Sequence, residues 1–221
     1  MKNILYVGPS WANRSYDTVE GSETEYTSLL KELRIEATDL SKPGSSNMEC
    51  LDKINAYQGN IDAILWLYCE PIGDVLHENK KSLIESEDFW KIRKQINQDT
   101  LSMINQLDIP IGLIGAHSDI FDCDHKNLTV IHDSWQKFLA KKVGVYLNKG
   151  WGAEIAHRYA MYEFKDSKPS RAFVEYTSNT LQAWTKMELS GVFRGVHPNR
   201  KGNELFAQEI KNSVKSFINN L

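Results

Sequence analysis

Short apolar runs alternate with longer segments of helical periodicity along this chain of 221 residues. A continuous apolar run of this length predicts a buried strand. Such runs fall at residues 3–8, 35–40, 61–68 and 109–114, and a shorter one at 129–131. Apolar residues recur at helical spacing in segments 22–33, 47–57, 87–107, 135–147, 152–162, 171–189 and 200–218. Strands alternating with helices predict an α/β fold, whose parallel sheet of about five strands is covered on both faces.

Two local signals mark where helices should begin. Ser22 with Glu25 three residues later has the capping-box pattern, which predicts a helix start at Ser22. Asn47 follows the loop of residues 41–46 and is a good N-cap residue for the next helix. No internal repeat or linker interrupts the pattern, so residues 1–221 are expected to form a single domain.

Composition excludes several classes of protein. Hydrophobic residues make up 41% of the chain, enough for a core without disulfides, and the net charge is −3. That balance offers no basic face for nucleic acid, and no apolar run reaches the roughly 18 residues of a membrane span. Three cysteines without CxxC spacing indicate a reducing compartment. The first residues are too briefly apolar for a signal peptide, so a cytoplasmic protein is expected.

The carboxyl ends of parallel strands gather the loops in which chemistry is usually found. Four loops leave the predicted strands there, at residues 8–17, 41–47, 69–74 and 115–125. We expect them to converge in space.

Three residues in or near these loops could carry acyl-transfer chemistry. Ser10 follows the first strand in Gly-Pro-Ser-Trp, where a turn would expose its hydroxyl and its N–H. His197 stands before a proline at the entrance to the last helix, where an imidazole could accept the serine proton. Gly44 allows close approach to a ligand, and its N–H could hold an oxyanion. Each also has a simpler interpretation, as a turn serine, a helix-start histidine and a turn glycine.

In their order along the chain, Ser10, Gly44 and His197, with the His-Pro-Asn-x-x-Gly stretch of residues 197–202, resemble the SGNH (GDSL-like) hydrolase superfamily of serine esterases. The resemblance spans Ser10 to Gly202 and implies a flavodoxin-like three-layer α/β/α fold. It implies that Ser10 is the nucleophile and an oxyanion donor, Gly44 a second donor, and His197 the general base. A small-molecule or carbohydrate ester would be the substrate, and no cofactor is implied. Trp11 and Asn47 would line the pocket.

Two positions depart from that family's pattern. Its catalytic acid lies three residues before the histidine, where this chain has Arg194. Its third strand leads to Gly-x-Asn, where this chain has Tyr-Cys-Glu-Pro with Glu70. Glu70 would oppose an oxyanion or orient His197, and Asp119 is another possible substitute acid. A degenerate member of the fold, used to bind a ligand or a partner, is therefore the alternative to an esterase.

The loop after the fourth strand holds a different mixture of side chains. His117, Asp119, Asp122 and His125 could ligate a divalent metal and support a phosphoesterase. Short Asp-rich loops are more often turns, so no metal site is predicted.

Overall fold

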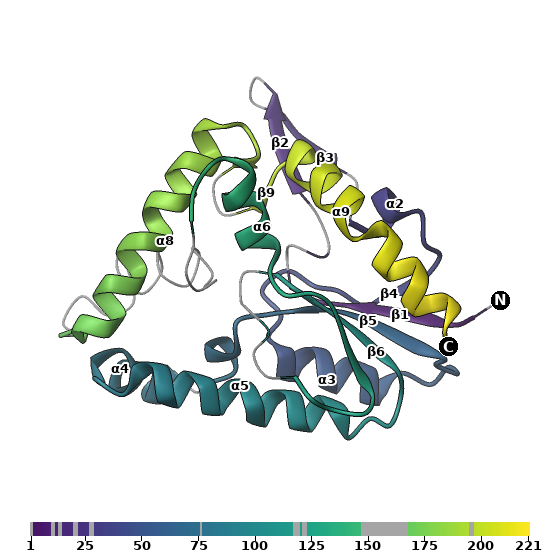
Figure 1. The fold of residues 1–221 in the computed structure, drawn as a ribbon. Coiled ribbons are helices and arrows are strands. Elements are labelled where there is room, and N and C mark those ends of the chain that lie inside the picture. The colour runs from purple at the N-terminus through teal and green to yellow at the C-terminus, as the bar shows by residue number, and fades with distance from the viewer. Residues whose placement is uncertain are drawn as a thin grey trace.

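The computed structural model describes the fold of most of the chain (Figure 1). The described residues are 2–9, 12, 15–19, 22–26, 29–75, 77–116, 120, 123–146, 168–194 and 197–221. The predicted helix at residues 152–162 and the pocket residue Trp11 lie outside them, as do Ser10 and Asp119.

A five-stranded parallel sheet forms the centre of the molecule. Its strands are β1 (Ile4–Val7), β4 (Thr38–Asp39), β5 (Ala63–Tyr68), β6 (Ile111–Gly115) and β7 (Leu128–His132). They lie in the order β4-β1-β5-β6-β7, and every neighbouring pair is parallel. The predicted α/β fold with about five parallel strands is confirmed, because each of the five apolar runs contributes one of these strands. The strand order is that of flavodoxin-like folds.

Helices cover both faces of the sheet, as its buried side chains require. The described helices are α2 (Leu29–Leu33), α3 (Asn47–Ala56), α4 (His77–Glu85), α5 (Phe89–Asn105), α6 (Trp135–Lys142), α8 (Arg171–Leu189) and α9 (Arg200–Asn219), with a 3₁₀ turn at Pro71–Asp74. Along β5, Leu65 belongs to the apolar cluster under α2 and α9, whereas Ile64 and Trp66 belong to the cluster under α3 and α5. This alternation produces the three layers visible in Figure 1.

Two short hairpins were not predicted. Strands β2 (Ser15–Val19) and β3 (Ser22–Tyr26) pair antiparallel, as do β8 (Phe193–Arg194) and β9 (His197–Pro198). The predicted helix at 22–33 is therefore wrong over its first half, and helix α2 begins only at Leu29. The Ser22–Glu25 spacing imitates a capping box, but the two-residue link Glu20-Gly21 favours a hairpin, and cross-strand pairing decides the structure.

Helix α3 begins at Asn47, and the residue that caps it is Ser46 rather than Asn47. The Ser46 hydroxyl accepts from the Glu49 N–H, and the Glu49 carboxylate accepts from the Ser46 N–H. This is the reciprocal capping box that the chain does contain. Because Ser46 caps the helix, the Asn47 side chain is available for contacts with the sheet.

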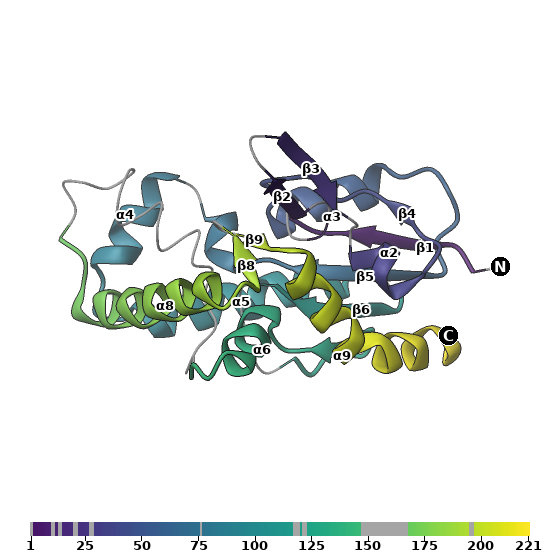
Figure 2. The ribbon, with the colours of Figure 1, turned by 90° about the horizontal axis from the view of Figure 1, so that it is seen from above.

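Helices α4 and α8 lie beyond the carboxyl ends of the strands, away from both chain ends (Figures 1 and 2). A third apolar cluster joins both helices to the start of α5, and in it Phe89 of α5 and Phe173 of α8 meet edge to face with ring centroids 5.5 Å apart. The Ser170 N–H donates to the Ile84 carbonyl at 3.0 Å, which ties the start of α8 to α4. None of the described helices is long and apolar enough to cross a bilayer.

Candidate functional site

The strand order places a topological switch point between β1 and β5. From β1 the chain continues to β4 on one side and later to β5 on the other, so the loops at the carboxyl ends of β1 and β5 diverge. In open parallel sheets this divergence forms the crevice in which ligands bind. The loop with Gly8 and the loop of residues 69–74 lie at this point.

Gly8 directly follows β1, at a position where no side chain would fit. A Cβ atom there would lie 2.7 Å from the Leu67 Cβ and 2.9 Å from the Ala12 Cβ. The Ala12 N–H donates to the Pro9 carbonyl at 2.9 Å, and the Lys42 N–H donates to the Gly8 carbonyl at 3.2 Å. The loops after β1 and β4 therefore meet at Gly8, as predicted for these two.

Gly44 lies in a tight turn after β4. The Ser45 N–H donates to the Lys42 carbonyl at 3.1 Å, with Pro43 and Gly44 at the centre of the turn. Gly44 has φ +76°, the left-handed conformation that the third residue of a type II turn needs. The turn alone accounts for this glycine, and Gly44 is exposed.

The Asn47 carboxamide joins the loop after β4 to the end of β5. Its Oδ1 accepts from the Cys69 N–H at 2.9 Å and from the Trp66 indole at 3.3 Å. Its Nδ2 donates to the Cys69 carbonyl at 3.2 Å and to the Asp74 carboxylate at 3.1 Å. These bonds use its full donor and acceptor capacity. Asn47 is thus a buried connector between two site loops and has no free N–H for a ligand.

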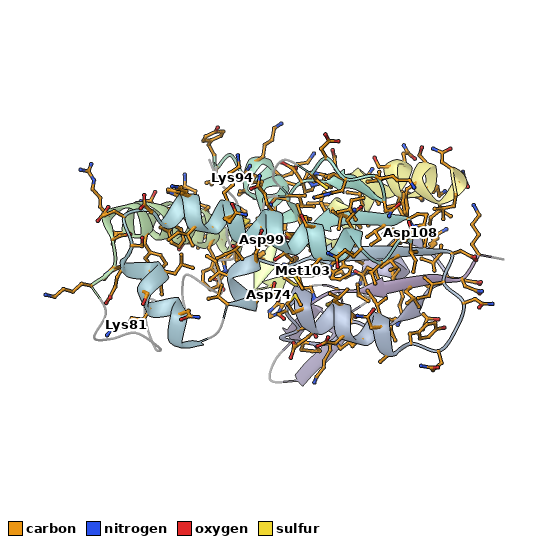
Figure 3. All side chains as sticks on the ribbon, turned by 90° about the horizontal axis from the view of Figure 1, so that it is seen from below. Asp74, Lys81, Lys94, Asp99, Met103 and Asp108 are labelled. Carbon is orange, nitrogen blue, oxygen red and sulfur yellow. The ribbon has the colours of Figure 1, made fainter. Side chains whose placement is uncertain are left out.

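Asp74 caps the other side of the α3 N-terminus. Its carboxylate accepts from the Met48 N–H at 2.8 Å as well as from Asn47. Burial raises the pKa of Asp74 above its ordinary value, although the hydrogen bonds from Met48, Ser46 and Asn47 oppose the shift. Figure 3 shows Asp74 beside the start of α3, on the face that α3 and α5 cover.

Glu70, at the exit of β5, is paired with an arginine that the sequence analysis overlooked. Arg93 on α5 donates from Nε to Oε1 at 2.9 Å and from Nη2 to Oε2 at 2.6 Å. The exposed fractions of the two side chains are 0% for Glu70 and 1% for Arg93. The guanidinium balances the carboxylate, so Glu70 enters the site region as half of a neutral, two-point salt bridge.

The overlooked signal is a polar residue on a buried helical stripe. The buried side of α5 runs through Phe89, Arg93, Asn97 and Leu101, each four residues after the last. Ile92, an apolar residue of the same helix, lies off this stripe and is 38% exposed. Asn97 accepts from the Tyr68 hydroxyl at 3.0 Å, so both polar residues of the stripe serve the end of β5. Apolar spacing alone does not reveal this.

A second buried carboxamide lies at the exit of β6. The Gln136 N–H donates to the Ala116 carbonyl at 3.0 Å, and the Ala116 N–H donates to the Tyr68 carbonyl at 3.0 Å. Gln136 is fully buried, and its Oε1 and Nε2 have no hydrogen-bond partner in the structure as described. Buried carboxamides are rarely left unsatisfied. Within the structure as described, the Gln136 carboxamide therefore has donor and acceptor groups that no other group uses, close to the carboxyl ends of the strands.

His197 is half-buried in β9, directly opposite Arg194 of β8 in the antiparallel register. Only residues 195 and 196 separate the two strands. Position 194, which corresponds to the acid of the SGNH pattern, is thus adjacent to the histidine across a backbone ladder. Strand β9 also contacts β2, which begins five residues after Ser10.

The other residues of the His-Pro-Asn-x-x-Gly stretch anchor this hairpin. Asn199 caps α9 by accepting from the Gly202 N–H at 3.0 Å, and its Nδ2 donates to the Gly191 carbonyl at 2.9 Å. A Cβ atom on Gly202 would lie 2.3 Å from the Val192 carbonyl oxygen. The asparagine and glycine therefore fix where His197 stands.

The alternative metal loop is described only in part. His125 and Cys123 are among the described residues, while His117, Asp119 and Asp122 are not. Within the described ranges, no group of three His, Cys, Asp or Glu side chains could hold a metal ion.

Comparison of the chain with protein-family models, with curated proteins and with solved structures found no match in any of the three.

Proposed function

We propose that this protein is a serine hydrolase that acts on an ester through a Ser10–His197 pair. Ser10 attacks the acyl carbon after His197 accepts its proton, and the protonated imidazole then donates to the leaving alcohol. Water releases the acyl group in the reverse sequence of proton transfers. The N–H groups of Ser10 and Gly44 hold the developing oxyanion. The substrate class is a short acyl ester of a small molecule or a carbohydrate.

The observation that carries the proposal is where the segments next to Ser10, Gly44 and His197 lie in the sheet topology. Ser10 follows β1, the strand beside the switch point, and Gly44 follows β4, the strand next to β1. The hairpin after Ser10 contacts the strand of His197 through β2. These relations support a shared location, near the carboxyl ends of the strands, for three residues with complementary roles in acyl transfer.

The proposal includes a weakened site. Arg194 stands at the position of the usual acid, and Glu70 is bound to Arg93, so Asp119 is the proposed substitute. Both N–H groups of the Asn47 carboxamide already donate hydrogen bonds within the protein, so this side chain does not replace the missing oxyanion amide. Loss of one oxyanion donor costs about 100–1000-fold in turnover. We therefore expect slow hydrolysis.

The same observations favour a second candidate, a catalytically degenerate protein that binds a ligand or partner on this fold. A buried Glu70–Arg93 pair in place of the amide loop, with an arginine opposite His197, is compatible with binding without turnover. This candidate predicts a retained pocket and no covalent acyl intermediate.

A fluorophosphonate probe separates the two candidates because it labels only an activated serine. We expect labelling of the wild-type protein, loss of labelling in Ser10→Ala, and no change in Ser102→Ala, whose hydroxyl is exposed and donates to the Gln98 carbonyl. Hydrolysis of p-nitrophenyl acetate should follow the same pattern. Labelling that does not depend on Ser10, or no labelling at all, would reject the hydrolase and leave the binding protein.

A further inference from the structure

A pocket of about 600 Å³, a size that suits a small molecule, lies at the carboxyl end of β7. Helices α6 and α9, which are neighbours in Figure 2, form two of its sides. The polar side chains that line it come from the exit of β7, from α6 and the turn after it, and from α9, namely His132, Asp133, Lys137, Lys141, Tyr146 and Glu209. We call it the β7 pocket.

The turn that ends α6 shapes one side of the β7 pocket. The Gly144 N–H donates to the Lys141 carbonyl at 3.1 Å, and the Val145 N–H donates to the Ala140 carbonyl at 2.9 Å. With Gly144 at φ +75°, these are the two bonds of a Schellman motif. Val145 packs against the apolar core, and the next side chain, Tyr146, is 80% exposed. The motif therefore holds the Tyr146 ring beside the pocket without burying it.

His132 offers the β7 pocket a hydrogen-bond donor in a fixed orientation. Burial lowers the pKa of His132, so its ring is neutral near pH 7. Nδ1 accepts from the Ser134 N–H at 3.1 Å, which places the proton on Nε2. The ring packs edge to face against Phe138 and Phe206, with centroids 6.0 and 5.0 Å away. Nε2 is thus the nitrogen with which His132 can donate to a ligand.

The formal charges of the described residues that line the β7 pocket cancel. Lys137 and Lys141 are four residues apart on α6, whereas the carboxylates of Asp133 and Glu209 come from the exit of β7 and from α9. An anion in the pocket would meet both carboxylates, and a cation would meet both ammonium groups. An apolar ligand would remove water from the charged groups without replacing its hydrogen bonds. The pocket therefore fits a neutral, polar ligand.

Donors and acceptors are mixed around the β7 pocket. The lysine ammonium groups and the His132 Nε2–H donate, and the two carboxylates accept. Asp133 Oδ1 lies 3.5 Å from His132 Nδ1, so a donor side chain and an acceptor side chain are neighbours. A zwitterion would instead need them separated at two ends. A hydroxyl group both donates and accepts, so a ligand with several hydroxyl groups matches this arrangement.

Tyr146 adds an aromatic surface to these polar groups, and aromatic rings pack well against apolar C–H groups. A sugar ring combines hydroxyl groups along its edge with C–H groups on its faces. We infer that the β7 pocket binds a sugar, whose C–H face packs on Tyr146 and whose hydroxyl groups bond to His132 Nε2, the two lysines and the two carboxylates. Sugar binding here requires neither Ser10 nor His197, so it is compatible with both candidate functions.

Titration of the full chain with single sugars, followed by two-dimensional amide NMR spectra, tests this site. The probes are D-glucose, D-galactose and N-acetyl-D-glucosamine at millimolar concentrations. At least one of them should shift the backbone amide signals of Gly144, Tyr146 and Glu209. We expect a dissociation constant of roughly 1 mM, because the aromatic surface is open to water and each hydroxyl exchanges one set of hydrogen bonds for another. No shift of these signals with any of the three sugars would overturn the inference.

Variants at Tyr146 locate the binding. Tyr146→Ala should weaken it roughly two- to tenfold, because the aromatic surface is lost, whereas Tyr146→Phe should retain it. The control is Val174→Ala, which shortens an exposed apolar side chain of α8 outside the pocket and should bind like the wild type. Unchanged affinity in Tyr146→Ala would contradict the site. Ser10→Ala should also bind normally, which separates failure of sugar binding from failure of the hydrolase.

Inorganic phosphate and glycine represent the two competing ligand classes, anions and zwitterions. Neither should shift the amide signals of Gly144, Tyr146 and Glu209 as strongly as the best of the sugars does. Larger shifts with phosphate or glycine would overturn the assignment of the β7 pocket to a sugar.

Discussion

The Arg93 guanidinium and the Glu70 carboxylate form a two-point salt bridge from which solvent is excluded, between helix α5 and the exit of strand β5. This pairing explains how the charged Glu70 can be buried directly after β5, next to the core of the sheet. The cost of desolvating each charge is offset by the partner and by the geometry of the fork. The pair also fixes the loop that carries Cys69, to which Asn47 is bonded.

Removing one member of this pair should be far more damaging than removing both. We expect Arg93→Met to lower the free energy of unfolding by about 3–5 kcal/mol, because it removes the guanidinium that balances the charge of the buried Glu70 carboxylate. The double variant Arg93→Met with Glu70→Leu should recover most of that loss. Urea denaturation measures both effects. Arg200→Ala is the control, since its pair with Glu204 is exposed and should change stability by less than about 0.5 kcal/mol.

Arg194→Asp should increase Ser10-dependent ester hydrolysis, because position 194 lies directly opposite His197 in the β8–β9 ladder. A carboxylate there can orient the imidazole and stabilise its protonated form, a role worth up to about 10⁴-fold in a complete triad. Arg194→Asn tests whether charge removal alone suffices, and should give a smaller gain. The ratio of kcat values for the two variants is the measurement. Equal gains would show that the carboxylate does not act on His197.

The sheet could be predicted from the sequence because its central strands β1, β5 and β6 are buried on both faces and read as continuous apolar runs. The hairpins could not, since Ser15–Val19 and Ser22–Tyr26 have few apolar residues and pair across a two-residue link, and β8 and β9 have only two residues each. The Ser22–Glu25 spacing also suggested a helix start where the chain forms β3. The capping box of α3 begins at Ser46, one residue before the predicted cap Asn47.

The sequence could predict the position only of those candidate residues that lie in loops at the ends of strands or helices. Gly44 and His197 lie in segments whose place follows from strand order, but Arg93 comes from a helix that spacing rules treat as apolar. Pairing of Glu70 with Arg93 depends on how α5 packs under β5, a long-range contact that no local pattern encodes. The roles of Ser10, Gly44, His197 and Asp119 stay predictions.

We expect the Gln136 carboxamide to lower the free energy of unfolding relative to an apolar side chain of similar size. Its buried carboxamide has no hydrogen-bond partner in the structure as described, so Gln136→Met should raise the free energy of unfolding by about 1–3 kcal/mol. If the amide serves the proposed reaction from the exit of β6, the same variant should lower ester turnover. Gln208→Met, at an exposed position of α9, should change neither quantity. Loss of stability in Gln136→Met would show that the amide is satisfied in solution.

His132 should make the protein less stable in mild acid. Burial lowers the pKa of His132 below its ordinary 6.5, against the opposing effects of Asp133 and Glu209, and its Nδ1 accepts from the Ser134 N–H at 3.1 Å. Below about pH 6.5 the unfolded chain therefore binds the proton more readily than the folded one, and stability falls with pH until the lowered pKa is passed. His132→Asn keeps an acceptor for Ser134 but cannot titrate. Urea denaturation at pH 7.5 and pH 5.0 should show a smaller acid loss in His132→Asn than in the wild type, and equal losses would assign the effect to other groups.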